Sequence, residues 1–146
     1  YSRLRVGRIL AATLGSSAME TLQNACKLAQ ADGASLVVLY VVEVPEHLPV
    51  DTFLPQQFIE GEKALQRAEA IAGDYGIPIE KRSVQGRTAG EAICEVAAEE
   101  KCDLIIIGSP TKRPLGERLG GRTMDHVLKN APCRVLVYLA ESPARP

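Results

Sequence analysis

DLIIIGSPTKRPLGERLGGRT, residues 103–123, is the segment from which the rest of this sequence is best interpreted. Residues 103–107 are apolar after the initial aspartate and stop at Gly108, which is typical of a central parallel strand covered on both faces. The loop 109–120 carries three cations and one glutamate, and two prolines restrict its backbone while two glycines loosen it. We therefore expect a stiff, basic and exposed loop directly after a buried strand.

The residues after this loop predict a helix that begins at Gly121 and is stopped by Pro132. Its apolar residues fall on one face at helical spacing: Met124, Val127, Leu128 and Ala131. The free N–H groups and the positive dipole end of this helix would lie beside the basic loop, an arrangement that attracts phosphate. Anion binding is one interpretation, and a solvated loop with scattered charges is the other.

The rest of the chain alternates between strand and helix patterns. Strands are predicted at 8–14, 36–44, 77–84, 103–107 and 133–139. This order implies an α/β fold, a three-layer α/β/α sandwich of flavodoxin-like or Rossmann-like type with a five-stranded parallel sheet and right-handed crossovers. Ligands bind such sheets beyond the carboxyl ends of the strands, at the topological switch point. We expect the loops after Ala12, Val41 and Gly108 to meet there.

Local signals mark the ends of the other helices. Ser17 with Glu20, and Thr88 with Glu91, fit capping boxes in which side chains satisfy free N–H groups of the first turn. Pro55 is well placed to open the second helix after a long connection. The apolar residues of that helix follow helical spacing and are expected to face the core: Phe58, Ile59, Ala64, Leu65, Ala68 and Ile71.

Length and composition indicate one ordinary globular domain. The chain has 146 residues with 46% hydrophobic content, enough for a full core without metals or disulfides. We expect the domain to span 1–139 and a flexible, polar, Pro-rich tail to follow at 140–146. The net charge of −1 suggests neither a nucleic-acid partner nor an anionic membrane. The longest apolar run, 36–42, falls far below the roughly 20 residues of a membrane span, so no membrane insertion of this segment is expected.

The cysteines and histidines indicate no reactive centre. None of the four cysteines belongs to a CxxC pair, so reduced thiols and a cytoplasmic location, including the cytoplasmic side of a membrane protein, are expected. Cys94 and Cys102 fit either a redox pair or two small buried side chains, whereas Cys26 and Cys133 are expected in the core. His126 falls outside the apolar stripe of its helix and is expected at the surface.

No spacing in the sequence indicates catalysis or a metal centre. The P-loop pattern G-x-x-x-x-G-K-[ST] is absent, and residues 14–17 do not fit the S-G-G-x-D-S loop of α/β ATP pyrophosphatases. Neither paired carboxylates nor a Ser/His/Asp set can be assembled from the spacing. We therefore predict no catalytic residue, no metal ligand and a protein that is not an enzyme.

These segments together resemble the universal stress protein family over residues 6–139. The matching segments are RILAAT, LVVLYVV, CDLIIIG and APCRVLVYL. The family's nucleotide motif looks like Gly, two residues, Gly, nine residues, Gly and then Ser or Thr. In this chain Gly108, Thr111 and Gly121 keep that spacing, and Arg122 occupies the hydroxyl position. The resemblance implies an adenine-nucleotide-hydrolase-like variant of the α/β/α sandwich.

The resemblance also implies a nucleotide site. Adenine and ribose would contact Ala12, Thr13 and Val41. The phosphates would lie against the basic loop and the start of the next helix, on Gly108, Ser109, Thr111, Lys112, Gly121, Arg122 and Thr123. The implied ligand is ATP or AMP, and the only metal implied is the Mg²⁺ that accompanies the nucleotide.

Three departures from the family pattern are expected to weaken binding. Leu14 stands where ATP-binding members have Asp, and it cannot accept a hydrogen bond from ribose or adenine. Thr111 replaces a glycine, and Arg122 replaces a small hydroxyl. Losing two such contacts at about 1–1.5 kcal/mol each lowers affinity roughly 10- to 100-fold. Charged hydrogen bonds from Arg122 and Lys112 to phosphate would offset part of this loss.

Three functions are compared on this basis. The resemblance implies a regulatory module that binds an adenine nucleotide weakly and forms a homodimer across the last strand, 133–139, which is short, apolar and at a sheet edge. The alternative is an interaction scaffold without nucleotide, such as the cytoplasmic domain of a transporter (an amino-acid permease or antiporter), or a module that binds a signalling protein. An ATP-hydrolysing enzyme is the least supported, because no residue is an evident base.

Overall fold

The computed structural model describes residues 6–15, 17–110 and 121–140. Within these ranges five strands alternate with four helices, as predicted. The elements are β1 (Arg8–Ala12), α1 (Ala18–Asp32), β2 (Ser35–Glu43), α2 (Pro55–Asp74), β3 (Ile79–Gly86), α3 (Ala89–Glu99), β4 (Leu104–Pro110), α4 (Gly121–Asn130) and β5 (Arg134–Ala140). Most of the predicted basic loop and of the predicted tail, 140–146, lies outside the described residues; Ala140 ends β5.

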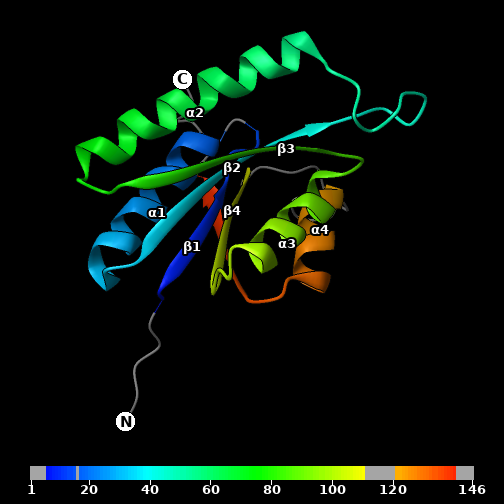
Figure 1. Cartoon of the computed structure of the whole chain (residues 1–146). Coiled ribbons are helices and arrows are strands. Elements are labelled where there is room, and N and C mark those ends of the chain that lie inside the picture. The colour runs from blue at the N-terminus through cyan, green and yellow to red at the C-terminus, as the bar shows by residue number, and fades with distance from the viewer. Residues whose placement is uncertain (1–5, 16, 111–120, 141–146) are drawn as a thin grey trace, which may run out of the picture.

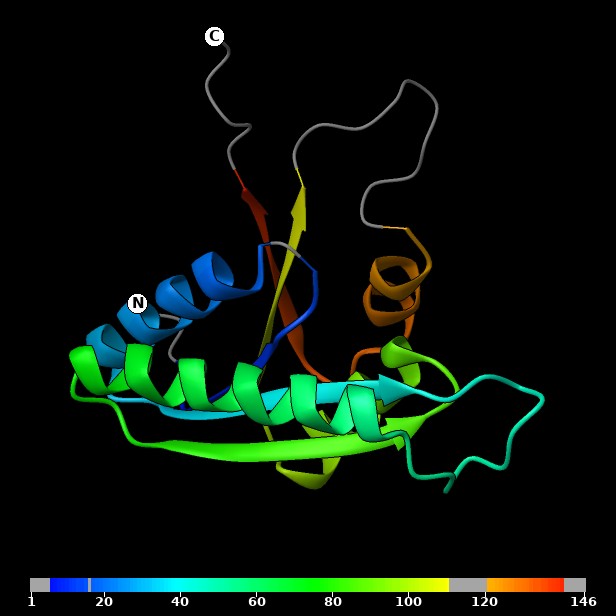
Figure 2. The same ribbon diagram turned by 90° about the horizontal axis from the view of Figure 1, so that it is seen from above.

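The strands form one parallel sheet in the order β3-β2-β1-β4-β5. The chain runs from the central β1 to β2 and β3 on one side and then to β4 and β5 on the other, so the topological switch point lies between β1 and β4. Helices α1 and α2 cover one face, and α3 and α4 cover the other (Figure 1); the turned view shows the same layers (Figure 2). The predicted three-layer sandwich is confirmed.

Two apolar cores explain the continuous hydrophobic runs of the inner strands. Along β1, Ile9 and Ala11 pack against α1 and α2, whereas Leu10 and Ala12 pack against α3 and α4. These four side chains are almost completely buried. Because both faces are covered, every position of an inner strand contributes to stability, by about 1.5–3 kcal/mol for a large aliphatic side chain.

The two predicted capping boxes have different outcomes. Thr88 caps α3, since its hydroxyl oxygen accepts a hydrogen bond of 3.3 Å from the backbone N–H of Glu91. The prediction for Ser17 is wrong, because its side chain makes no capping hydrogen bond. Ser17 is buried where α1 packs on β4, and its Oγ lies 2.7 Å from the position that a Cβ on Gly108 would occupy. The Ser17 hydroxyl therefore packs against β4 and does not cap α1.

The predicted buried face of α2 is wrong at its start. Phe58 and Ile59 are 51% and 48% exposed, whereas the buried residues of this helix begin at Gly61. The start of α2 stands away from the sheet, and the helix comes closer to β2 and β3 toward its end (Figure 1). With Val50 and Phe53 from the preceding connection, these two residues are exposed apolar side chains that we call the α2 patch; the rings of Phe53 and Phe58 are 5.6 Å apart.

Two other burial predictions need correction. Leu128 was expected on the buried face of α4, but it is half exposed, since only Met124 and Val127 of this helix are buried. Cys133 was expected in the core and is only partly buried, at the entry to β5, whereas Cys26 is fully buried as predicted. Both corrections concern α4 and β5, at the edge of the fold.

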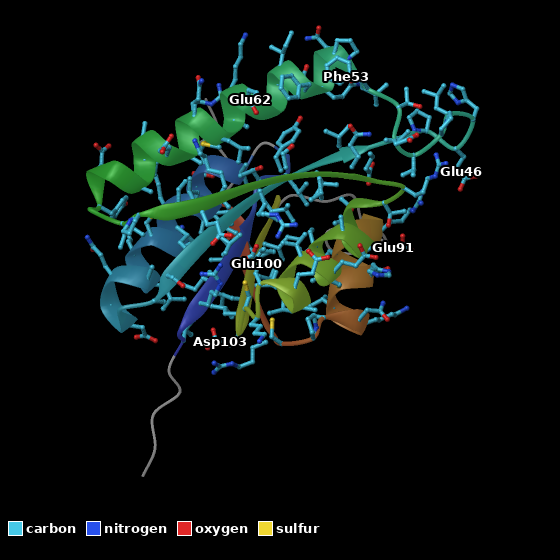
Figure 3. The ribbon with its side chains drawn as sticks, in the orientation of Figure 1. Glu46, Phe53, Glu62, Glu91, Glu100 and Asp103 are labelled. Carbon is cyan, nitrogen blue, oxygen red and sulfur yellow. The ribbon has the colours of Figure 1, made fainter. Side chains whose placement is uncertain are left out.

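Charged side chains connect the strands near their amino ends. The Arg8 guanidinium pairs with Glu80 at 2.8 Å and with Glu100, and Arg82 pairs with the second oxygen of Glu100. Hydrogen bonds from Arg8 and then Arg82 lower the pKa of Glu100 below its ordinary value. Asp103, labelled with Glu100 in Figure 3, accepts a 3.0 Å hydrogen bond from the backbone N–H of Arg8. This ionic network ties β3, which lies at one edge of the sheet, to β1 and to the end of α3.

Candidate functional site

A cavity of about 620 Å³ lies at the carboxyl ends of the inner strands, beside the switch point. Its wall comes from the ends of β1, β2 and β4 and from the first turns of α1 to α4. The lining residues are Leu14, Gly15, Ser17, Val41, Glu43, Gln57, Ala89, Ile107, Gly108, Thr123 and Met124. The predicted convergence is found for the ends of β1 and β2, which meet Gly108 of β4; β4 continues to Pro110 instead of ending at Gly108, and the loop after it lies outside the described residues. We call this space the main cavity.

A second, more polar cavity of about 410 Å³ adjoins the main cavity, since Glu43 and Thr123 line both. Its other lining residues come from the segment before α3 and from α3 and α4: Arg87, Thr88, Gly90, Glu91, Arg122 and His126. Glu91, at the start of α3, is labelled in Figure 3. We call this space the polar cavity. The two cavities together form a continuous cleft that is apolar toward β1 and charged toward α3 and α4.

The floor of the main cavity requires glycine at 108. A Cβ at this position would lie 2.1 Å from Thr21 Oγ1 and 2.7 Å from Ser17 Oγ, distances that no real contact allows. The Thr21 hydroxyl is buried and has no hydrogen-bond partner in the part of the chain that the structure describes. The close approach of α1 to β4 therefore explains Gly108 without any ligand.

Of the residues assigned to adenine and ribose, only Val41 lines the main cavity. Ala12 is buried in the core below it. The Thr13 hydroxyl donates a 2.9 Å hydrogen bond to the carbonyl of Leu39, and its side chain lines a separate cavity of about 420 Å³ with Tyr40, Glu60 and Arg67. The side chain of Leu14 lines the main cavity and leaves it open.

The residues assigned to phosphate are divided among several places. Gly108 and Thr123 line the main cavity, and Arg122 lies exposed at the polar cavity. Gly121 begins α4 with a φ of 71°, a value that favours glycine. The backbone of Ser109 pairs in β4 with Leu139 of β5. Thr111 and Lys112 lie outside the described residues.

Glu43 is a residue of the cleft that the sequence analysis missed. Its Oε2 accepts a 2.7 Å hydrogen bond from the backbone N–H of Ala89, which fixes the carboxylate at the start of α3. The signal was present in the sequence, because Glu43 is the single charge that ends the most apolar strand of the chain. Gln57 was also missed, since α2 approaches the cavity only through the tertiary fold.

Arg87 was also missed, and it shapes the rim of the polar cavity. Its Nη1 donates hydrogen bonds of 2.7 Å to the carbonyls of Pro45 and Leu48. The guanidinium therefore holds the connection between β2 and α2 against the start of α3. His126, expected at the surface, is half buried: its ring packs so closely on Gly90 that a Cβ there would lie 3.0 Å from the ring.

The cysteines line neither cavity of the cleft, and the shifts of their pKa values are those of buried thiols. Burial raises the pKa of Cys102 to about 11 and raises those of Cys94 and Cys133, so these thiols stay protonated near neutral pH. Among the described residues, no set of three His, Cys, Asp or Glu side chains is suited to a metal ion. Across the described helices, no apolar segment reaches the length that a membrane span requires.

Comparison with known proteins agrees with this architecture. Residues 6–138 match the model of the universal stress protein family. Universal stress protein MJ0531 of Methanocaldococcus jannaschii is 31% identical over 137 residues, which cover 89% of this chain and 80% of that protein. A solved universal stress protein in complex with cAMP has a TM-score of 0.74 at 24% identity, covering 94% of this chain and all of that one.

A more distant solved structure has the same fold. The universal stress protein family protein At3g01520 of Arabidopsis thaliana, with AMP bound, has a TM-score of 0.65 at 14% identity and covers 93% of each chain. The structural likenesses show the fold, and the sequence match runs from β1 to β5 through every strand end that forms the cleft. The chain therefore belongs to the universal stress protein family.

Proposed function

We propose that this chain is a cytoplasmic regulatory module that binds an adenine nucleotide weakly in the main cavity. The observation that carries the proposal is the cavity of about 620 Å³ at the switch point of a parallel sheet. Its volume falls within the roughly 300–1,000 Å³ of small-ligand sites, and its position is the usual one in this class of fold. The complexes of related proteins with cAMP and AMP support adenine as the base.

The composition of the cleft suggests how the nucleotide lies. Leu14, Val41 and Ile107 offer an apolar surface for the base. Thr123 in the first turn of α4 lines both cavities, so the N–H groups and positive dipole end of this helix face the cleft. Phosphates would lie there, near the Arg122 guanidinium. Any Mg²⁺ would arrive with the nucleotide.

Weak binding follows from the same residues. Leu14 offers no acceptor to ribose or adenine, and Thr13 does not replace it because Thr13 is not among the residues that line the main cavity. A ligand donor that faces Leu14 gains no hydrogen bond in exchange for the water it loses, which costs affinity. Arg122 would recover part of that loss through a charged hydrogen bond.

Isothermal titration calorimetry with ATP, AMP, cAMP and GTP tests the proposal. We expect saturable heat with the adenine nucleotides at up to millimolar ligand and less with GTP. The wild-type chain without ligand, followed by thermal melting, controls for folding. No heat with any adenine nucleotide at millimolar concentration would contradict the proposal.

We also propose a homodimer through β5. This strand lies at the edge of the sheet, and its Leu136 and Leu139 are 44% and 45% exposed. An apolar edge strand pairs readily with a second copy. Light scattering should give about twice 15.7 kDa for the wild type, and less for Leu139→Lys. A monomer at all concentrations would reject this assembly.

An interaction scaffold is the second candidate, and the α2 patch favours it. This patch gathers four exposed apolar side chains, with the rings of Phe53 and Phe58 in contact with each other, and exposed apolar patches are a common feature of protein-binding sites. The partner would be a transporter or a signalling protein. A photo-crosslinker placed at Phe53 in cells should capture one defined partner, whereas one at the charged position Glu62 should not. Equal capture at both positions would reject the scaffold.

A further inference from the structure

Glu43 lies where the two cavities of the cleft meet. We infer that its carboxylate accepts hydrogen bonds from the ribose hydroxyls of the bound nucleotide, and so selects ribonucleotides over deoxyribonucleotides. The inference rests on the proposed function, because it assigns one part of the ligand to one side chain of the same cleft.

The position of Glu43 is fixed by the fold. It ends β2, two residues beyond Val41, and its Oε2 is bonded at 2.7 Å to the backbone N–H of Ala89. No described residue donates a hydrogen bond to Oε1. Glu43 is exposed, so water can donate to Oε1 in the free protein, and an ionised carboxylate accepts equally from a ligand group that replaces this water.

The arrangement of the two cavities assigns the ribose to the junction at Glu43. A nucleotide carries its ribose between base and phosphate. Glu43 and Thr123 are the two residues that line both the apolar main cavity and the polar cavity. A base on Leu14 and Val41 and phosphates near Arg122 therefore bring the sugar to Glu43.

The charge of Glu43 favours a sugar over a phosphate at this junction. A phosphate beside this carboxylate would be repelled, whereas two neighbouring hydroxyls can both donate to it. Acidic side chains at the ends of parallel strands hold ribose hydroxyls in this way in dinucleotide-binding folds. Among the described residues that line the main cavity, Glu43 is the one acidic side chain, and Leu14 supplies no acceptor.

The experiment compares ATP, 2′-deoxy-ATP and 3′-deoxy-ATP by calorimetry on the wild type, Glu43→Gln and Glu46→Gln. Glutamine keeps an oxygen for the N–H of Ala89, so the start of α3 is preserved while the charge is lost. Glu46→Gln makes the same change in charge three residues away, in the exposed connection and outside both cavities. Thermal melting of the free proteins verifies that each variant is folded.

We expect the wild type to bind at least one deoxynucleotide about tenfold more weakly than ATP. Glu43→Gln should bind ATP about tenfold more weakly and lose most of this discrimination, and Glu46→Gln should behave as the wild type. Replacing ATP by ITP, which lacks the adenine amine, should weaken nucleotide binding by the same factor in the wild type and in Glu43→Gln.

Three results overturn the inference. If the wild type binds no adenine nucleotide, the proposed function fails and the inference fails with it. If ATP binds but Glu43→Gln discriminates between ATP and the deoxynucleotides as the wild type does, only the inference fails. If Glu43→Gln instead loses discrimination between ATP and ITP, Glu43 contacts the base and the ribose assignment is wrong.

Discussion

Replacing Gly108 by alanine should destabilise the protein through clashes of the new methyl group with α1 and its N-cap residue. The new Cβ would lie 2.1 Å from Thr21 Oγ1 and 2.7 Å from Ser17 Oγ, so α1 would have to move away from β4. Gly108 does not have a positive φ, so the backbone itself accepts alanine without strain. Overpacking of this kind typically lowers the free energy of unfolding by about 1–3 kcal/mol. Because two atoms clash, we expect Gly108→Ala to lie at the upper end, at about 3 kcal/mol. The melting temperature should fall by about 6–12 °C.

Removal of the closer of the two clashing atoms should restore part of the stability, because the contact with Ser17 Oγ remains. Thr21→Ala deletes Oγ1, which has no hydrogen-bond partner in the described part of the chain, so little hydrogen bonding is lost. The double variant Gly108→Ala/Thr21→Ala should be more stable than the sum of the single effects by about 1–2 kcal/mol, the coupling expected for residues in contact. Urea unfolding followed by circular dichroism measures all three variants.

Gly73→Ala is the matched control, because a Cβ there has no atom within 4 Å and its φ is not positive. In helix α2 the change should be neutral or stabilising by about 0.5–1 kcal/mol. The packing argument is refuted if Gly108→Ala is as stable as Gly73→Ala, or if Thr21→Ala adds its own cost without any rescue.

Three further predictions concern the cleft, the ionic network and the helix α2. Arg122→Ala should weaken ATP about tenfold and leave adenosine unchanged in calorimetry, since a charged hydrogen bond to phosphate is removed; equal loss for both ligands would contradict this. The pKa of Glu100 is lowered, first by Arg8, so its stabilising effect is present above its ordinary value of 4.5 and is lost as pH falls through the lowered value. Glu100→Gln should therefore be less stable than the wild type at pH 7, with the difference shrinking toward pH 2 in urea unfolding; a difference independent of pH would refute it. Phe58→Ser should change stability by less than ~1 kcal/mol because the ring is exposed, whereas Leu65→Ala in the same helix should cost about 2–5 kcal/mol; equal costs would show that the ring is buried in solution.

Much of the fold follows from local pattern. An apolar run such as 36–42 predicts an inner strand because both of its faces are covered in a parallel sheet. The Thr88 cap was correct, since its hydroxyl accepts from the N–H of Glu91 three residues later, within the first turn of α3. The Ser17 cap and the burial of Phe58 were wrong because they depend on where a helix lies on the sheet. Helical spacing identifies which face of a helix is apolar. It does not tell which part of the helix packs on the strands.

The site could be predicted as a place, and only partly as a set of residues. Strand order alone brings the carboxyl ends of β1 and β2 together beside β4, and the cavity lies there, lined by Gly108 within β4. Thr13 nevertheless lines a cavity elsewhere, because successive side chains beyond a strand point to opposite faces. Glu43 was overlooked because its side chain is positioned by a hydrogen bond from the backbone N–H of Ala89, which is distant in sequence.

By itself, the sequence determined the family, the alternation of strands and helices, and the edge of the sheet at which a ligand would bind. These features depend on hydrophobic pattern and on short-range hydrogen bonds, which each segment contains. Only the tertiary structure decided which side chains line the cleft, why Gly108 tolerates no Cβ and where Glu43 is fixed. These depend on the distances between segments far apart in the chain, and no local pattern encodes those distances.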